Sequence, residues 1–366
     1  MSDKFKRFRY IALIAFLMVL LPLLALMIDF GRDFEQNPKI GIIILGDITV
    51  PGWNKSHYDG IKAACDRFGL ELLVRDKVPE NTGQCSEKIR ELAGEGVGMI
   101  FLASFDYAVE AKDAVAEFHN IAFATNSSEV HLRNLTAYFP RMYQARYLAG
   151  ALAGMKTKSN VIGYVAAIPN AEVVRGIDAF TLGVQRVNPN AKVVVIWTNA
   201  WENEEQEAIN AERLITEAGA DVLTYHQDED ATGKVAEKYG VDFIAYNAIL
   251  TGYSEHYLTS VICHWELYYI DMIERHLKGE LNIMKNHWLG IDRGAVGLSE
   301  FSSAVTPEMI SRLDSIKQEL IADKQIFVGP LYNIDGELFC EEGDALSDDL
   351  LFESMNQLVK GVEILE

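Results

Sequence analysis

The chain has 366 residues, of which 49% are hydrophobic and 23% are charged, with only 9 prolines. This length exceeds what one small core needs, and the composition is typical of a packed protein, so a short binding module and wholesale disorder are both excluded. The formal net charge of -20 leaves no basic field to attract phosphate backbones, which argues against nucleic acid as a partner.

The first 36 residues predict export from the cytoplasm. No charged residue lies between Ile11 and Ile28, and basic residues precede this run whereas acidic residues follow it. Such a pattern is typical of a signal peptide or an N-terminal transmembrane anchor that leaves the rest of the chain outside the cytoplasm. Ala25-Leu26-Met27 is a poor cleavage site and no Cys follows to carry a lipid, which favours an uncleaved anchor. A buried core helix is the alternative, but it would leave the basic flank without a role.

Four cysteines give no support for a metal centre. Their spacing contains no CxxC pair and fits no zinc pattern, and lone buried thiols are common in chains of this size. We therefore expect no metal, no cofactor and no disulfide scaffold.

From residue 39 onward, apolar runs of strand length alternate with amphipathic stretches of helix length. This rhythm predicts an α/β protein in which parallel sheets are flanked by crossover helices. It falls into two similar halves, near residues 39–138 and 139–255. The expected strands are 40–45, 70–74, 99–103, 121–124, 161–166, 192–197, 222–226 and 242–246. The expected helices are 57–68, 82–94, 108–118, 143–155, 173–187, 204–218 and 231–239.

After residue 255 the rhythm changes. We expect a helix over 265–277, a β-like stretch over 287–298, a helix over 307–322 and a hairpin at 333–336. Such a tail would cross between two lobes and leave a ligand cleft at their hinge. The expected organisation is 1–36 as tip, anchor or signal and linker, 37–138 with about 256–284 as first lobe, 139–255 with about 285–337 as second lobe, and 338–366 as C-terminal tail.

Aromatic and amide side chains recur directly after the expected strands. Ligands of open α/β sheets bind at the carboxyl ends of strands, so these loops are the expected site. Aromatic rings from opposing lobes can enclose a flat ring, while carboxamides offer donors and acceptors to its edge, which together fit a planar, nitrogen-rich heterocycle. For any single ring, ordinary packing is an equal alternative. The candidate ligand-binding residues are Trp53, Asn54, Phe105, Gln144, Asn199, Trp201, Asn247 and Trp265.

Acidic residues offer a weaker enzyme hypothesis. Asp106, His226, Asp228 and Asp230 could bind a cation or activate water, but no second histidine lies at ligand spacing, which favours a solvated acidic loop. No nucleophile elbow is present, and the cysteines have no convincing histidine partner. The sequence therefore predicts a cleft without a catalyst, and a protein that is not an enzyme.

Seven stretches together resemble the basic membrane protein family of ABC-transporter solute-binding proteins, in consistent order over about residues 39 to 337. They are 51–57 (PGWNKSH), 103–107 (ASFDY), 141–150 (RMYQARYLAG), 162–167 (IGYVAA), 172–180 (EVVRGIDAF), 187–189 (VNP) and 258–261 (LTSV).

The resemblance implies a two-lobed type I periplasmic-binding-protein fold. Such a protein closes on a purine nucleobase or nucleoside, adenine-like in the most similar branch, and delivers it to membrane permease subunits as a monomer in the periplasm or at the bacterial cell surface. It also implies that Trp53 and Phe105 stack on the ring and that Asn54 and Gln144 meet its edge. Asn199, Trp201, Asn247 and Trp265 would come from the closing lobe.

Two positions depart from the family pattern, since Gln144 and Asn247 stand where Glu and Asp are more frequent. Loss of carboxylates favours a neutral ligand or a different purine. The alternative function is a membrane-anchored ectodomain that senses a ligand for a signalling partner, although only about ten residues precede the apolar run and could report to the cytoplasm.

Overall fold

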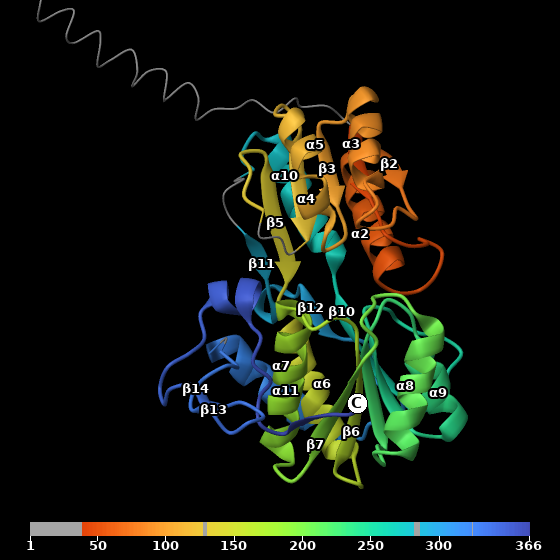
Figure 1. The fold of residues 1–366 in the computed structure, drawn as a ribbon, viewed down its shortest axis with the longest axis vertical. Coiled ribbons are helices and arrows are strands. Elements are labelled where there is room, and N and C mark those ends of the chain that lie inside the picture. Colours follow the sequence, from red (N-terminus) through yellow and green to blue (C-terminus); the bar gives the residue numbers. More distant parts are fainter. Residues whose placement is uncertain (1–38, 127–129, 282–285, 324) are drawn as a thin grey trace, which may run out of the picture.

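The computed structural model describes residues 39–126, 130–281, 286–323 and 325–366. They form two lobes stacked along the long axis of the molecule (Figure 1). The expected membrane anchor, residues 11–28, lies outside these residues. Within the described ranges, no helix is long and apolar enough to cross a membrane.

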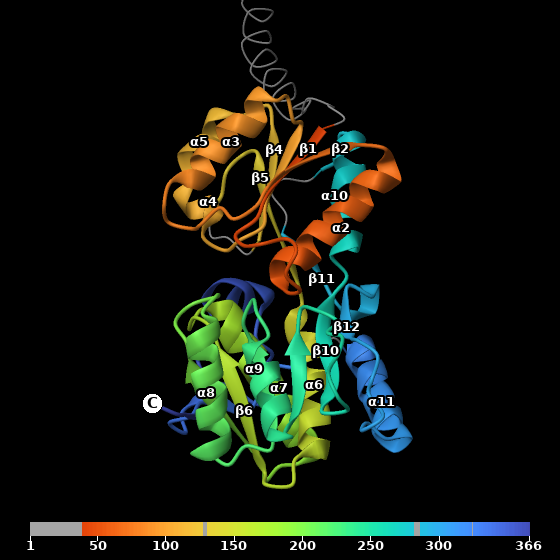
Figure 2. The ribbon, with the colours of Figure 1, turned by 90° about the vertical axis from the view of Figure 1, so that its right-hand side faces the viewer.

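The first lobe is a six-stranded sheet of order β11-β5-β4-β3-β1-β2 in which every neighbouring pair is parallel. Its central strands are buried along their whole length, as expected for a sheet covered on both faces. Figure 2 shows α2 and α10 on one face and α3, α4 and α5 on the other. The elements are β1 (Lys39–Ile43), α2 (Trp53–Phe68), β2 (Glu71–Arg75), α3 (Gln84–Gly94), β3 (Met99–Leu102), α4 (Tyr107–Glu110), α5 (Lys112–Glu117), β4 (Ala122–Asn126), β5 (Leu135–Pro140), α10 (Trp265–Leu277) and β11 (His287–Leu289).

The second lobe is a seven-stranded sheet of order β12-β10-β9-β8-β6-β7-β15, parallel except for β12 against β10. Helices α6 and α7 cover one face, and α8 and α9 cover the other (Figure 1). The elements are α6 (Met142–Lys156), β6 (Val161–Ala166), α7 (Ala171–Val187), β7 (Lys192–Trp197), α8 (Glu204–Thr216), β8 (Val222–His226), α9 (Ala231–Tyr239), β9 (Asp242–Tyr246), β10 (Tyr257–Cys263), the short helix η1 (Ile291–Arg293), β12 (Val296–Leu298), α11 (Pro307–Asp323), β13 (Leu331–Tyr332), β14 (Leu338–Cys340), the single turn η2 (Leu350–Ser354) and β15 (Val362–Ile364).

Helices α6 and α7 pack against each other through glycines. A Cβ atom on Gly150 would lie 1.9 Å from the carbonyl oxygen of Phe180, and one on Gly183 would lie 2.0 Å from that of Tyr147. The two backbones therefore approach more closely than any larger residue would permit. This contact holds α6 against the C-terminal half of α7.

Within the described residues, the chain crosses between the lobes three times, after β5, after β10 and after β11. Two of these crossings differ from the sequence expectation. Strand β10 pairs with β9 in the second sheet, so residues 256–263 do not belong to the first lobe. Strand β11 pairs with β5, so residues 287–289 do not belong to the second lobe. The expected β-like stretch is two short strands in different sheets, which a continuous apolar pattern cannot reveal.

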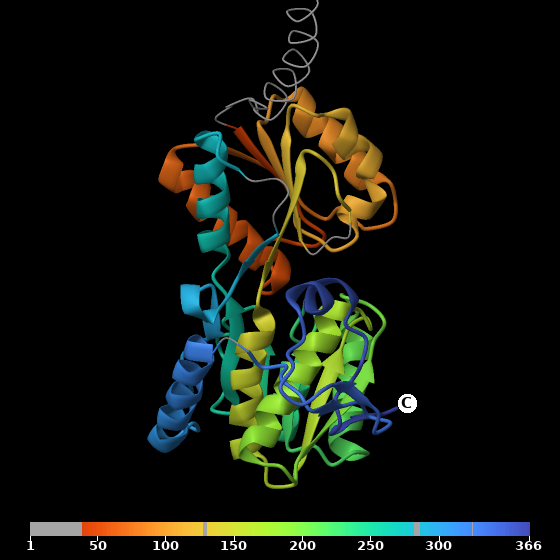
Figure 3. The same ribbon diagram turned by 90° about the vertical axis from the view of Figure 1, so that its left-hand side faces the viewer.

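Residues 338–366 are more than a tail, since β15 pairs with β7 and completes the edge of the second sheet. On the way, the segment passes the hinge (Figure 3). There Asp348 accepts hydrogen bonds from both terminal nitrogens of Arg141, with Nη1 at 2.7 Å from Oδ1. The Phe352 ring lies 5.1 Å from that of Trp288 in β11 and packs into the core of the first lobe. The expected hairpin at 333–336 is present as β13 and β14.

Candidate functional site

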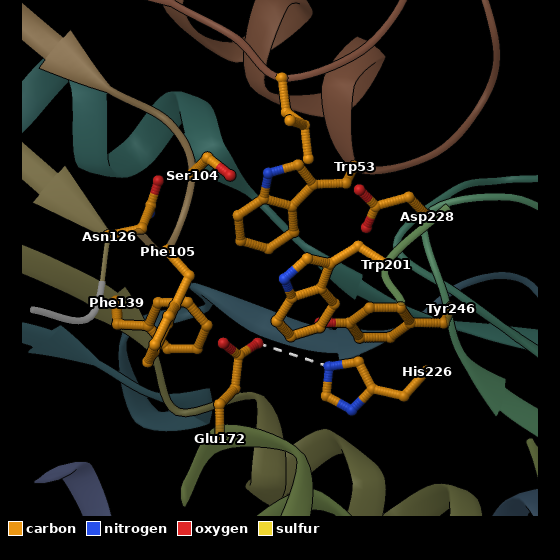
Figure 4. A pocket seen from close by; sticks show the side chains of 11 residues that line it. Trp53, Ser104, Phe105, Asn126, Phe139, Glu172, Trp201, His226, Asp228 and Tyr246 are labelled. Carbon is orange, nitrogen blue, oxygen red and sulfur yellow. Dashed lines mark ion pairs between the residues drawn. The ribbon is translucent and has the colours of Figure 1, made fainter. Parts of the chain in front are cut away.

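A narrow cavity lies between the lobes (Figure 4). Its walls come from the carboxyl ends of eight strands and the loops that follow them, because the two parallel sheets point these ends toward each other. The first lobe contributes Leu45, Trp53, Ser104, Phe105, Asn126 and Phe139. The second lobe contributes Glu172, Trp201, His226, Asp228 and Tyr246.

The wall of the first lobe is built around Trp53, the first residue of α2. Its Nε1 donates a 3.0 Å hydrogen bond to the carbonyl oxygen of Ala103, and its ring lies 6.2 Å from that of Phe139 at an angle of 27°. Trp265 packs edge-on against it from behind, at 5.2 Å. The indole is therefore held in place from several sides and borders the cavity together with Phe105 (Figure 4).

The wall of the second lobe combines rings with ionisable groups. Glu172 lies in the first turn of α7, whose N-cap Asn170 accepts a hydrogen bond from the backbone N–H of Val173. Glu172 Oε1 lies 3.4 Å from His226 Nε2, and the His226 ring lies 4.4 Å from that of Tyr246. Trp201 reaches across from the loop after β7 (Figure 4).

Burial shifts the protonation of this second wall. It lowers the pKa of His226 to about 4, and the Arg146 charge adds to this shift while Glu172 opposes it. Burial also raises the pKa of Asp228 well above its ordinary range, with further contributions from neighbouring carboxylates, Glu202 foremost. At neutral pH the imidazole is therefore uncharged and the Asp228 carboxyl holds its proton more tightly than a solvated one.

The lobes touch each other at the edge of the cavity. Asn54 Nδ2 donates to Glu202 Oε1 at 3.1 Å, and Ser56 Oγ donates to the carbonyl oxygen of Asn247. Gly52, with φ of 151°, passes so close to the Asp228 backbone that a Cβ atom would lie 2.1 Å from its carbonyl oxygen. Residues 52–56 of the first lobe therefore close one edge of the cavity against the second lobe.

The structure brings three of the predicted site residues, Trp53, Phe105 and Trp201, into the cavity lining. Asn54 lies at its edge, where it also accepts a 3.0 Å hydrogen bond from Gly46 N. Asn199 is exposed after β7 with φ of 57°. None of the remaining predicted residues appears among the lining side chains.

Gln144 and the pair of Asn247 and Trp265 serve the hinge in this structure. Gln144 Oε1 accepts a 2.9 Å hydrogen bond from Ile291 N, next to the crossing after β11. Asn247 Oδ1 lies 3.4 Å from Trp265 Nε1, and Trp265 is buried behind Trp53. The oxygens of both carboxamides therefore accept hydrogen bonds from the protein itself, whereas the buried Nδ2 of Asn247 forms none with the described residues.

Sequence reasoning did not select Glu172, Asn126, Phe139 or Tyr246 as ligand-binding residues. The signal that could have found them is position, since Asn126, Phe139 and Tyr246 stand at or near the last residue of their strands. His226 and Asp228 were considered as an acidic metal or hydrolytic site. In the described parts of the chain, no group of three or more potential ligands from His, Cys, Asp and Glu could hold a metal ion.

The family to which the chain belongs follows from comparison with known sequences. The model of a family described as "ABC transporter substrate-binding protein PnrA-like" matches residues 37–328, which is most of the chain. The chain belongs to this family. Substrate-binding proteins of ABC transporters act outside the cytoplasm, bind a solute and present it to a permease, and the family is one of binding proteins.

Two curated relatives of this substrate-binding family align over nearly the whole chain. The purine-binding protein of Brucella abortus is 29% identical over 94% of this chain and 99% of its own length. A putative ABC transporter glucose-binding protein of Haloferax volcanii is 31% identical over 91% of this chain and 82% of its own length. The ligands for which these two relatives are named thus differ.

A solved ABC transporter solute-binding protein from Aeropyrum pernix has a TM-score of 0.66 at 16% identity, covering 80% of this chain and 93% of its own. The two-lobed type I periplasmic-binding-protein fold expected from the sequence is confirmed.

Proposed function

We propose that this substrate-binding protein encloses a purine nucleobase or nucleoside, with adenine-like ligands favoured, in the cavity between its lobes. The observation that carries the proposal is the pairing of aromatic rings from both lobes across one cavity, with Trp53 and Phe105 on one side and Trp201 and Tyr246 on the other. Flat aromatic ligands gain most from such walls, because ring stacking adds to the burial of apolar area. The Brucella abortus relative, named for purine binding, supports the same ligand class.

The cavity is narrow in this structure. The space open to the centre of a water molecule is about 20 Å³, room for about one water, so the lobes must part to admit a nucleobase or nucleoside. In this proposal, lobe closure around the ligand creates the form that the permease recognises. The N-terminal apolar segment would hold the protein at the outer face of the membrane.

The Haloferax volcanii relative makes a sugar the competing ligand, since aromatic faces and carboxylates also suit sugars. Thermal unfolding of the full-length chain in mild detergent, with nucleobases, nucleosides, sugars and amino acids as additives, tests the choice. A ligand at a hundred times its dissociation constant stabilises by about 2.7 kcal/mol, a readable rise in melting temperature.

A rise confined to purines supports the proposal, and a rise confined to sugars contradicts it. The alternative function, a membrane-anchored ectodomain that senses a ligand, has the same binding step but acts on a signalling partner instead of a permease. Reconstitution with permease subunits and measurement of ligand uptake separates the two.

A further inference from the structure

The Glu172 carboxylate is buried beside the cavity without a strong hydrogen bond to the protein. Its side chain is only 7% exposed, yet within the described residues its one polar contact is the 3.4 Å approach to His226 Nε2. Neither nitrogen of the His226 ring completes a hydrogen bond. Because an unpaired buried carboxylate is costly, the site is arranged for a donor that the chain itself does not supply.

The surroundings favour a negative charge at this position. Glu172 lies in the first turn of α7, where the free backbone N–H groups of the helix stabilise an anion. Arg175, one turn further on and fully buried, interacts electrostatically with it. The His226 imidazole beside it is uncharged at neutral pH and does not neutralise the carboxylate.

The direction of the side chain joins this charge to the ligand. Figure 4 shows the carboxylate pointing from α7 into the space between Phe105 and Trp201. A flat ring held between these aromatic side chains would present its edge, and not its face, to Glu172. A carboxylate accepts hydrogen bonds and repels carbonyl oxygens, so it selects an edge that carries an amino group.

We propose that Glu172 determines the ligand specificity of the cavity by accepting a hydrogen bond from the exocyclic amino group of the bound ring. This inference rests on the proposed function and names the chemistry that decides among purines. A 6-amino purine fits the site, and a 6-oxo purine places an oxygen against the carboxylate.

The test compares adenine, unsubstituted purine and hypoxanthine by titration calorimetry on the full-length chain and on Glu172→Gln. The unaltered protein should bind adenine about tenfold or more tightly than purine, which lacks only the amino group. Glu172→Gln should weaken adenine binding by about tenfold, leave purine nearly unchanged and improve hypoxanthine relative to adenine, because the new amide can donate to the oxygen.

Glu207→Gln is the matched control. Glu207 is a buried glutamate of the same lobe outside the cavity lining, where it accepts hydrogen bonds from Thr232. Burial raises the pKa of Glu207 to about 8, so its carboxyl group is already largely protonated at neutral pH. The glutamine of the variant is therefore similar in charge to the side chain that it replaces. This variant should preserve all three affinities.

The outcomes separate the two proposals. Equal binding of adenine and purine by the unaltered protein overturns the role of Glu172, and this comparison needs no variant to fold. An equal loss for all three ligands in Glu172→Gln also overturns it, while purine binding itself stands. Absence of binding to any purine overturns the proposed function and this inference with it.

Discussion

The two walls of the cavity differ in how fully the protein satisfies their polar atoms. In the first lobe, the Trp53 indole N–H is hydrogen-bonded to the backbone, and only Asn126, beside the Tyr138 phenol, has a carboxamide without a hydrogen bond of good geometry. In the second, the Tyr246 hydroxyl and both nitrogens of His226 form no hydrogen bond with the described residues. Buried polar atoms without partners cost free energy that a ligand can recover. In the proposed complex, we therefore expect the second wall to make most of the polar contacts with the ligand and Asn126 to supply those of the first.

The largest expected effect concerns pH and the second wall. The folded pKa of His226, about 4, lies below the ordinary 6.5, so the unfolded chain binds more protons between these values. Stability should therefore be lost as pH falls through this window, by at most about 3 kcal/mol from this group. The test measures denaturant unfolding of the unaltered protein and of His226→Gln at a series of pH values. The difference between the two profiles gives the contribution of His226, because His276 and the nearby Glu172, Arg146 and Arg175 are present in both proteins. Parallel profiles for the two proteins would contradict the burial of a neutral imidazole.

Next in size is the loss of a ring from the first wall. Trp53→Ala should weaken binding of the purine by about 1–3 kcal/mol, because it removes one stacking face. Titration calorimetry measures the affinity, and thermal unfolding verifies the fold. Tyr332→Ala, an exposed aromatic residue on the β13–β14 hairpin, serves as control and should bind normally. Unchanged affinity in Trp53→Ala would mean that the ligand does not lie against this wall.

Two Tyr→Phe substitutions, one in each lobe, test whether the lobes differ in the hydrogen bonding of their buried hydroxyl groups. Tyr107→Phe in the first lobe removes a buried hydroxyl that donates to the carbonyl oxygen of Val78, and should cost about 1 kcal/mol of unfolding free energy. Tyr246→Phe removes a buried hydroxyl without a partner and should leave the stability of the ligand-free protein unchanged or slightly higher. Equal losses measured by denaturant unfolding would show that the two lobes do not differ in this respect.

The smallest expected effect lies at the hinge. Asp348→Asn removes the charge opposite Arg141, but the aspartate side chain is 59% exposed, so solvent screens the pair. We expect a change below about 1 kcal/mol in stability and correspondingly little in affinity. A tenfold change in affinity would show that this contact controls lobe closure more strongly than an exposed ion pair can.

The sequence predicted the alternation of strands and helices well, because buried parallel strands are continuous apolar runs such as those of β3 and β7. It missed β5, whose residues Leu135–Pro140 mix polar and apolar side chains although all are buried. The prediction of the lobe to which β10 and β11 belong was wrong, because each strand joins the sheet of a pairing partner that is distant in sequence.

The site was predictable only in part for the same reason. Trp53, Phe105 and Trp201 follow strand ends and reach the cavity. Trp265 also follows a strand, but Gly60 allows α10 to pack against α2 so closely that its ring is buried behind Trp53. The sequence predicted that the Gln144 carboxamide contacts the ligand, yet its oxygen accepts a hydrogen bond from Ile291 N. This contact joins residues at the hinge that are distant in sequence, so the local sequence does not reveal it.

The segment that follows residue 328 lies beyond the part of the chain matched by the family model, and it passes between the cores of both lobes at the hinge. Arg175 Nη1 donates a 3.0 Å hydrogen bond to the carbonyl oxygen of Leu351 there, while Phe352 packs against Trp288. The apparent affinity of a two-lobed binder equals its intrinsic affinity scaled by the closed fraction. Substitutions in this segment can therefore retune how much ligand the protein captures at a given concentration without altering any group that chooses the ligand.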